Sequence, residues 1–113
     1  MFRMTTAEEI IRILGLKHHP EGGYYREIYR HPAPDGGRGL MTSIYYMILA
    51  SDQDKWHRHD AQEIWCHHAG APAELTYWVE GQPLQKHRIG TNFAAGERPQ
   101  VQRRAQTAFF FEP

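Results

Sequence analysis

His57, His59 and Glu63 are the residues whose types and spacing are best suited to metal chemistry. In a β-strand, residues two positions apart point to the same face, so a strand over residues 55–59 places both imidazoles side by side. Three residues separate His59 from Glu63, enough for a tight turn that returns the carboxylate to the imidazoles on a neighbouring antiparallel strand. Two nitrogen donors and one oxygen donor suit Zn, Fe, Mn, Ni or Cu. The pattern therefore predicts a divalent metal site.

A purely structural interpretation of the same residues needs no metal. Strand alternation places two like residues on one face by chance, so His57 and His59 can be exposed strand residues and Glu63 a solvated turn carboxylate. Of the other residues that could do chemistry, we expect Cys66 to be a small buried hydrophobe and His87 to be solvated.

A short helix and a series of strands must position these residues. Thr6 and Glu9 have the spacing of a capping box and Gly15 supplies a stop, so we expect a helix over about residues 6–15. The Gly22–Gly23 pair predicts a bulge at the start of the first strand. Aromatic and β-branched stretches bounded by Gly, Pro, Asp or Asn give the expected strands: residues 24–29, 42–49, 55–59, 63–68, 74–79, 84–89 and 107–111. This spacing predicts an all-β antiparallel sandwich or barrel.

The composition excludes some classes of partner. The 113 residues fit one globular domain, residues 1–113, in which 13 Lys and Arg residues balance 13 Asp and Glu residues. We expect no nucleic-acid partner, because a neutral chain has no basic field for phosphates, and no membrane partner, because no apolar run approaches roughly 20 residues. The single cysteine and the absence of a signal-peptide pattern favour a cytoplasmic location.

The region around the two histidines resembles a known pattern. The spacing H-x-H-x3-E-x6-G, from His57 through Glu63 to Gly70, matches the first motif of the cupin superfamily, with Ser51 where the leading glycine usually stands. A closer resemblance, to the cupin_5 group of largely unknown function, rests on five blocks in order along the chain. They are H-P-E-G-G-Y-Y-R-E-I-Y-R (residues 19–30), T-S-I-Y-Y (42–46), W-H-R followed by E-I-W (56–65), A-G-A-P-A-E-L (69–75) and G-E-R-P-Q-V (96–101).

The resemblance implies a double-stranded β-helix, the cupin jelly-roll barrel, over about residues 19–111, with a ligand pocket inside it and assembly as a homodimer. Three Trp, six Tyr and five Phe residues, together with open sheet edges, also favour association with a second copy. Relatives are likened to seed-storage cupins and to sugar-nucleotide epimerases. Carried onto this sequence, the pocket residues are His57 and Glu63, with Tyr25, Arg26 and either Tyr45 or Tyr46 as lining.

The sequence departs from the pattern of this group at two places. The group commonly has an aliphatic residue in place of His59 and a histidine in place of Cys66, so the metal site is inferred from this sequence alone. The second cupin motif, P-x-G-x2-H-x3-N, supplies another ligand, whereas this chain has V-Q-R-R-A-Q-T-A-F-F-F-E-P, with Arg103 near a turn that normally requires glycine. We expect either a truncated or frame-altered C-terminus that exposes the phenylalanines at 109–111, or a terminal strand that packs them in the core.

Two classes of function follow from these residues. The first is a cupin that binds a small polar molecule, a sugar derivative or a carboxylate, with Tyr25, Arg26 and Tyr46 as substrate-binding residues. The second is a non-catalytic cupin for storage or ligand sensing, or an inactive shortened member of the group.

If the protein is an enzyme, two mechanisms are open. With a divalent metal at His57, His59 and Glu63, the ion acts as a Lewis acid, and Glu63 or a bound water moves the proton. Without a metal, His57 serves as general base beside Glu63, and Tyr45 donates a proton in an epimerase-like step.

Overall fold

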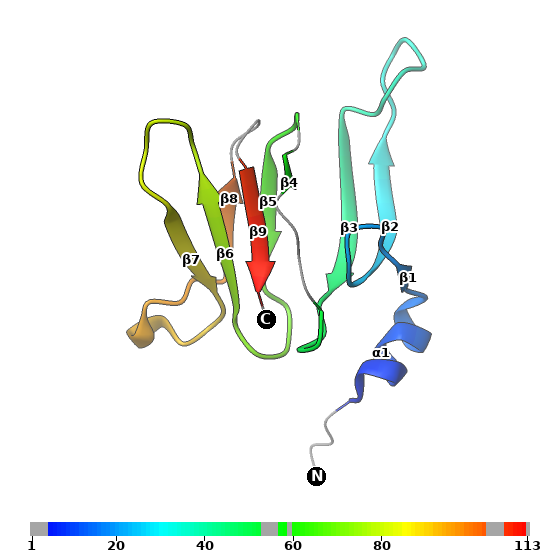
Figure 1. Ribbon diagram of the computed structural model, residues 1–113. Helices are drawn as coiled ribbons and strands as arrows, with labels where there is room; N and C mark the ends of the chain where they lie inside the picture. Colours follow the sequence, from blue (N-terminus) through cyan, green and yellow to red (C-terminus); the bar gives the residue numbers. More distant parts are fainter. Residues whose placement is uncertain (1–4, 53–56, 59, 104–107, 113) are drawn as a thin grey trace. The chain divides into compact units, whose positions relative to one another are not determined.

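The computed structural model describes residues 5–52, 57–58, 60–103 and 108–112 (Figure 1). The chain divides into two compact units, Met1–Ser51 and Asp52–Pro113, which we call the N-terminal unit and the C-terminal unit. Antiparallel strands are the predominant regular structure of the described residues, and an α-helix stands near the start of the chain. The predicted all-β class with one short N-terminal helix is confirmed.

Helix α1 (Ala7–Leu14) begins and ends where the sequence indicates. Thr6 is its N-cap, and the Thr6 hydroxyl accepts a hydrogen bond from the Glu9 amide at 3.2 Å, which satisfies one of the free amides of the first turn. Gly15 ends the helix in the left-handed conformation, with φ 66°, where a residue with a side chain is strained. The predicted helix start at Thr6 and helix end at Gly15 are therefore confirmed.

Three antiparallel strands in the order β1-β2-β3 complete the N-terminal unit. They are β1 (Lys17–His18), β2 (Tyr24–His31) and β3 (Met41–Met47). Gly23 has a φ of 78°, and a Cβ at this position would lie 2.7 Å from the Met47 carbonyl oxygen. Gly22 and Gly23 thus form the turn between β1 and β2 rather than the predicted bulge. The irregularity in β2 lies instead between Glu27 and Tyr29.

The C-terminal unit contains two antiparallel sheets among the residues that the structure describes. Their strand orders are β4-β9-β6-β7 and β5-β8. The strands are β4 (His57–Arg58), β5 (Glu63–Cys66), β6 (Ala73–Trp78), β7 (Gln85–Ile89), β8 (Gln100–Arg103) and β9 (Ala108–Glu112). A short 3₁₀ helix, η1 (Phe93–Ala95), lies between β7 and β8 in the chain.

Strand β6 lies between β7 and β9 and carries the centre of the larger sheet (Figure 1). Leu75 is fully buried and Ile89 on β7 is 4% exposed, and strand alternation puts both on one face. The opposite face carries Glu74 and Lys86, which form an ion pair at 3.5 Å. The same face carries Thr76, which is 1% exposed, so both faces of this sheet contain buried side chains.

Each predicted strand has a counterpart in the structure, whereas β1 and β8 were not predicted. The predicted strand 55–59 is represented by β4, and residues 55, 56 and 59 lie outside the described residues. Strand β9 pairs with β6 on one side and with β4 on the other. Its backbone is thus inside a sheet, which agrees with the terminal-strand alternative.

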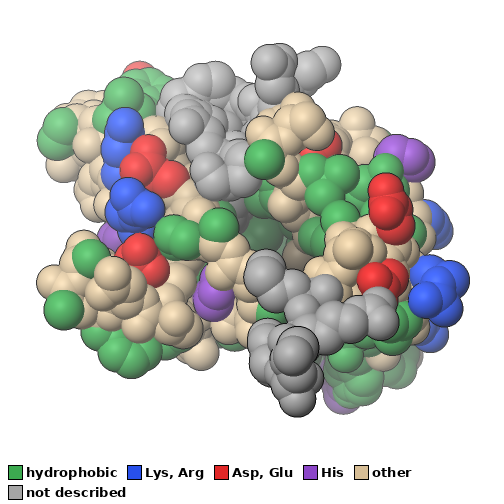
Figure 2. All heavy atoms as spheres, turned by 90° about the horizontal axis from the view of Figure 1, so that it is seen from below, with side chains coloured by type: hydrophobic (Ala, Val, Ile, Leu, Met, Phe, Trp, Pro, Cys, Tyr) green, Lys and Arg blue, Asp and Glu red, His purple; other side chains and the backbone are tan. Residues whose placement is uncertain are grey.

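The surface carries both apolar and charged side chains. On the face drawn in Figure 2, hydrophobic side chains lie next to Lys, Arg, Asp, Glu and His side chains. The most exposed large hydrophobic residues include Leu40, Ile13, Ile64 and Phe93. Single exposed apolar residues are ordinary on protein surfaces, so the homodimer stays a prediction. Among the described residues, no helix is long and apolar enough to cross a membrane.

Candidate functional site

In the part of the chain that the structure describes, the strand that carries His57 and the strand that carries Glu63 pair with different neighbours. Strand β4, which contains His57, pairs with β9, and strand β5, which contains Glu63, pairs with β8. The expected arrangement, in which a tight turn after His59 returns Glu63 on a neighbouring strand of the same sheet, is therefore wrong. The side chain of His57 and the whole of His59 lie outside the described residues. Their role as ligands stays a prediction.

Glu63 forms an ion pair with Arg103, which lies directly opposite it in the β5–β8 ladder. Glu63 Oε1 lies 3.1 Å from Arg103 Nη2, and Glu63 Oε2 accepts a hydrogen bond from Arg103 Nε at 3.4 Å. Guanidinium and carboxylate groups favour this two-bond arrangement. The Arg103 side chain is 0% exposed and the Glu63 side chain 23% exposed. The C-terminal unit therefore contains a buried arginine whose charge is balanced by Glu63.

Two neighbouring groups hold this pair in place. Trp65 Nε1 donates a hydrogen bond to Glu63 Oε2 at 3.0 Å, and Arg103 Nη2 donates one to the Ala61 carbonyl oxygen at 3.2 Å. Glu63 and Trp65 are two positions apart and share one face of β5, while the exposed Cys66 is on the other. The prediction that Cys66 is buried is wrong, because its position on β5 belongs to the exposed face.

The Glu63–Arg103 pair does not fit the predicted ligand role of Glu63. A carboxylate that holds a divalent cation must direct an oxygen at the ion, and a positive group beside it opposes the ion's charge. Here the Arg103 guanidinium bonds to both oxygens, and its burial weakens the screening of its charge. In the part of the chain that the structure describes, no group of three or more His, Cys, Asp or Glu side chains is placed to hold a metal ion.

Tyr77, Gln85 and His87 form a second polar cluster in the C-terminal unit, which the sequence did not predict. The Tyr77 hydroxyl donates to Gln85 Oε1 and lies 3.0 Å from His87 Nε2. The Tyr77 and His87 rings are stacked, with their centroids 5.2 Å apart. The direction of the second bond depends on which nitrogen of His87 carries the proton. His87 is half-buried and hydrogen-bonded, so the prediction of a solvated side chain is wrong.

The predicted lining residues of the N-terminal unit fall on two faces of one sheet. Tyr25 lies opposite Tyr46, and Arg26 lies opposite Tyr45, in the β2–β3 ladder. Successive residues of a strand point to opposite faces, so Tyr25 and Tyr46 share one face and Arg26 and Tyr45 share the other. The His19 ring joins the first pair, with its centroid 4.8 Å from that of Tyr25 and 5.3 Å from that of Tyr46.

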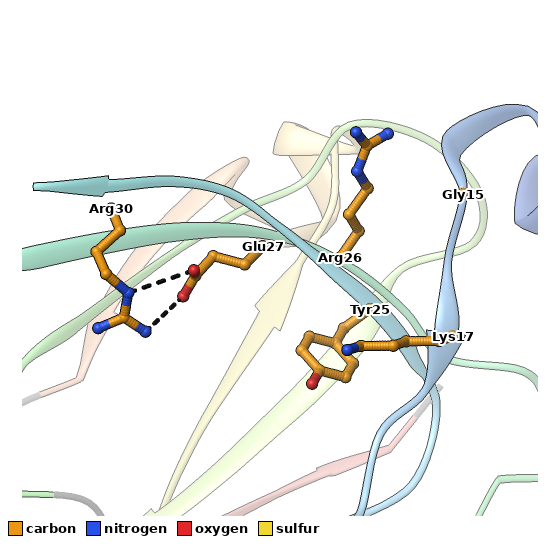
Figure 3. A pocket seen from close by; sticks show the side chains of 6 residues that line it. All are labelled: Gly15, Lys17, Tyr25, Arg26, Glu27 and Arg30. Atoms are coloured by element: carbon orange, nitrogen blue, oxygen red, sulfur yellow. Dashed lines mark hydrogen bonds and ion pairs between the residues drawn. The ribbon is translucent and has the colours of Figure 1, made fainter.

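A hollow of about 490 Å³ in the N-terminal unit brings two of the predicted residues, Tyr25 and Arg26, into one lining (Figure 3). The complete lining is Gly15, Lys17, Tyr25, Arg26, Glu27 and Arg30. The Lys17 ammonium lies 5.3 Å from the centroid of the Tyr25 ring, which is a cation–π distance. The lining contains three cations and one acid, and its net charge is positive even without Arg26, whose side chain lies on the other side of β2 from Tyr25.

The three cations of the hollow differ in the partners they already have. Arg30 forms two bonds with Glu27, at 2.7 and 3.3 Å. Arg26 Nη1 donates to the Leu14 carbonyl at 3.1 Å, and Figure 3 shows the Arg26 side chain on the other side of β2 from Tyr25. Lys17 makes no ion pair with any residue that the structure describes. Lys17 is therefore the cation best placed to meet an anion from solution.

Arg103, Tyr77 and His87 are the site residues that sequence reasoning missed. The sequence alone indicates only that Arg103 is a cation near a turn that normally requires glycine. Its pairing with Glu63 could not be predicted, because the two residues are 40 positions apart and strand β8 has no clear sequence signal. The Tyr77 cluster did leave a usable signal. Gln85 and His87 are two positions apart on a predicted strand, so their side chains lie on the same face of the sheet. An aromatic residue opposite Gln85 on the neighbouring strand, here Tyr77, therefore lies on that face as well.

The model of one protein family, described as Cupin_5: Cupin superfamily (DUF985), matches residues 8–112. The chain belongs to this family. The antiparallel, strand-dominated architecture is consistent with the cupin jelly roll, and the resemblance drawn from the sequence blocks is confirmed. Membership of Cupin_5 does not fix a ligand or a reaction, because one fold can carry many functions.

Solved structures extend the comparison for this Cupin_5 protein. An X-ray structure of a protein from Shewanella oneidensis is 35% identical, with a TM-score of 0.90, and the match covers 96% of this chain and 69% of that chain. A hypothetical protein from Leishmania major is 28% identical, with a TM-score of 0.85, and the match covers 96% of this chain and 70% of that chain. No curated protein matches. The ligand must therefore be argued from the chain's own residues.

Proposed function

We propose that this Cupin_5 protein binds a small polar molecule with a carboxylate group, such as a sugar acid, in the hollow of the N-terminal unit. The observation that carries the proposal is Lys17, a cation without an ion pair among the described residues, beside Tyr25 in a hollow of about 490 Å³. Small-molecule sites commonly have volumes of roughly 300 to 1,000 Å³.

The lining offers complementary contacts to such a molecule. The Lys17 ammonium supplies a point charge and hydrogen-bond donors for a carboxylate, and the Tyr25 ring supplies a flat apolar surface for the carbon-bound hydrogens of a sugar ring. The excess of cations raises the local concentration of anions near the hollow. Glu27 is bonded to Arg30, so the acid of the lining is partly neutralised.

These contacts are those of a binding site, and they favour the non-catalytic, ligand-sensing class over an enzyme. The Lys17 ammonium and the Tyr25 ring hold a ligand, and the acid Glu27 is engaged with Arg30. The metal-dependent and epimerase-like mechanisms, which rest on His57, Glu63 and Tyr45, remain predictions. So does the homodimer.

Calorimetric titration with glucuronate and with glucose tests the proposal, because the two sugars differ in a carboxylate. We expect glucuronate to bind and glucose to bind far more weakly. Replacing the cation in Lys17→Ala should weaken glucuronate binding about tenfold, or about 1.4 kcal/mol. Lys86→Ala is the matched control, since Lys86 is an exposed lysine on β7 in the C-terminal unit. Equal affinities of Lys17→Ala and wild type, or equal binding of both sugars, would contradict the proposal.

A further inference from the structure

Glu63 already has a positive partner inside the protein. Its two carboxylate oxygens face Arg103 Nη2 at 3.1 Å and Arg103 Nε at 3.4 Å, and the Trp65 indole N–H donates to Oε2 at 3.0 Å. The backbone sets this geometry, because Glu63 and Arg103 are register partners in the β5–β8 ladder. The pairing of β5 with β8 thus places the Arg103 guanidinium beside the Glu63 carboxylate and fixes the direction of its oxygens.

The burial of Arg103 makes this partnership hard to exchange. A guanidinium that is 0% exposed requires a nearby negative charge, because a buried charge without a partner is strongly destabilising. If Glu63 turned its oxygens toward a divalent ion, the two contacts between the Glu63 carboxylate and the buried Arg103 guanidinium, at 3.1 and 3.4 Å, would be lost. The ion would also face the buried guanidinium charge.

We propose that Arg103 takes the place of a metal ion at Glu63, so that this carboxylate is neutralised by an internal guanidinium and divalent cations do not bind through it. This inference is independent of the function proposed for the N-terminal unit. It assigns Glu63 and Arg103 the role of joining β5 to β8, and it removes Glu63 from the ligand set that the histidine motif predicts.

Nuclear magnetic resonance of the wild-type protein tests the inference without relying on a variant that folds. The Arg103 Nε–H and the Trp65 Nε1–H both point at Glu63, so their resonances report on any change in its partners. We expect neither resonance to shift when Zn²⁺ is added in molar excess and then removed with EDTA. A shift or loss of both resonances, with the Trp78 indole resonance unchanged, would overturn the inference. Through-bond correlations along the Arg103 side chain assign the guanidinium resonance in the wild-type protein.

A second measurement compares the Zn²⁺ affinity of Glu63→Gln with that of wild type by equilibrium dialysis. We expect the same affinity for both, because Glu63 contributes no ligand bond. Glu74→Gln is the matched control, since Glu74 is also a strand glutamate in an ion pair, with Lys86. A loss of Zn²⁺ affinity of about tenfold or more in Glu63→Gln alone would overturn the inference. If Glu63→Gln does not fold, the resonance spectra of the wild-type protein still test whether Zn²⁺ binds through Glu63.

Discussion

Each unit contains an ion pair between a glutamate and an arginine, and the pair with the shorter distance is the more exposed one. In the N-terminal unit, Arg30 and Glu27 approach to 2.7 Å with side chains 50% and 40% exposed. In the C-terminal unit, Arg103 and Glu63 approach to 3.1 Å with side chains 0% and 23% exposed. Water and salt screen the first pair far more than the second. The burial of the side chains, and not the distance between the charged atoms, therefore decides how strongly such a pair stabilises the protein.

The two pairs consequently have different roles. The exposed Glu27–Arg30 pair lies in the lining of a hollow, where both charges can be hydrated and a ligand can compete for them. The buried Glu63–Arg103 pair connects two strands that are far apart in the sequence, and its arginine has no access to solvent. The first pair adjusts the charge of a binding surface, and the second is part of the fold.

The largest expected effect comes from removing the buried cation. Arg103→Gln should lower the free energy of unfolding by about 3 kcal/mol, because Glu63 then keeps a partly buried charge without its partner. Urea denaturation followed by circular dichroism measures the change. A loss below about 1 kcal/mol would mean that the buried pair contributes no more than a surface pair, and the contrast between the units would disappear.

A smaller effect is expected when the charge is kept and the geometry is changed. Arg103→Lys retains a cation opposite Glu63 but replaces the planar, two-bond contact by a single ammonium contact, which should cost about 1.5 kcal/mol. The same urea titration applies. If Arg103→Lys is as unstable as Arg103→Gln, the shape of the guanidinium matters and its charge does not.

The smallest effect is expected for the exposed pair. Arg30→Gln should change the free energy of unfolding by less than about 0.5 kcal/mol, since both partners are hydrated and screened. High salt should remove what difference there is between Arg30→Gln and wild type, while the loss caused by Arg103→Gln should persist. An effect of Arg30→Gln equal to that of Arg103→Lys would show that exposure does not separate the two pairs.

Local sequence signals predict the secondary structure of both units well. The capping residues Thr6 and Gly15 act within one helix, so their spacing alone fixes where the helix begins and ends. Strand β3 is recognisable because six of its seven residues are β-branched, aromatic or apolar. Strand β8 is not, because its sequence Q-V-Q-R contains one β-branched residue, and it forms a strand through its pairing with β5.

The candidate site is less predictable because it depends on pairings between distant segments. The motif spacing suggested that Glu63 returns to the strand that carries His57, but β4 and β5 pair with β9 and β8 instead. The residues next to Glu63 in the sequence do not show whether its carboxylate binds a metal ion or forms an ion pair with Arg103. The family resemblance gave Tyr25 and Arg26 as lining of a barrel pocket that also contains His57 and Glu63; both line the hollow of the N-terminal unit instead, and their role in that barrel pocket stays a prediction.

The exposed thiol on β5 makes the C-terminal unit accessible to labelling in the natural sequence. Cys66 is the single cysteine of the chain, it is solvent-accessible, and it lies on the face of β5 opposite Glu63 and Trp65. A maleimide fluorophore attached there would stand on the far side of the strand from the ion pair. Folding of this unit can thus be followed by energy transfer from tryptophan to the label without a single substitution.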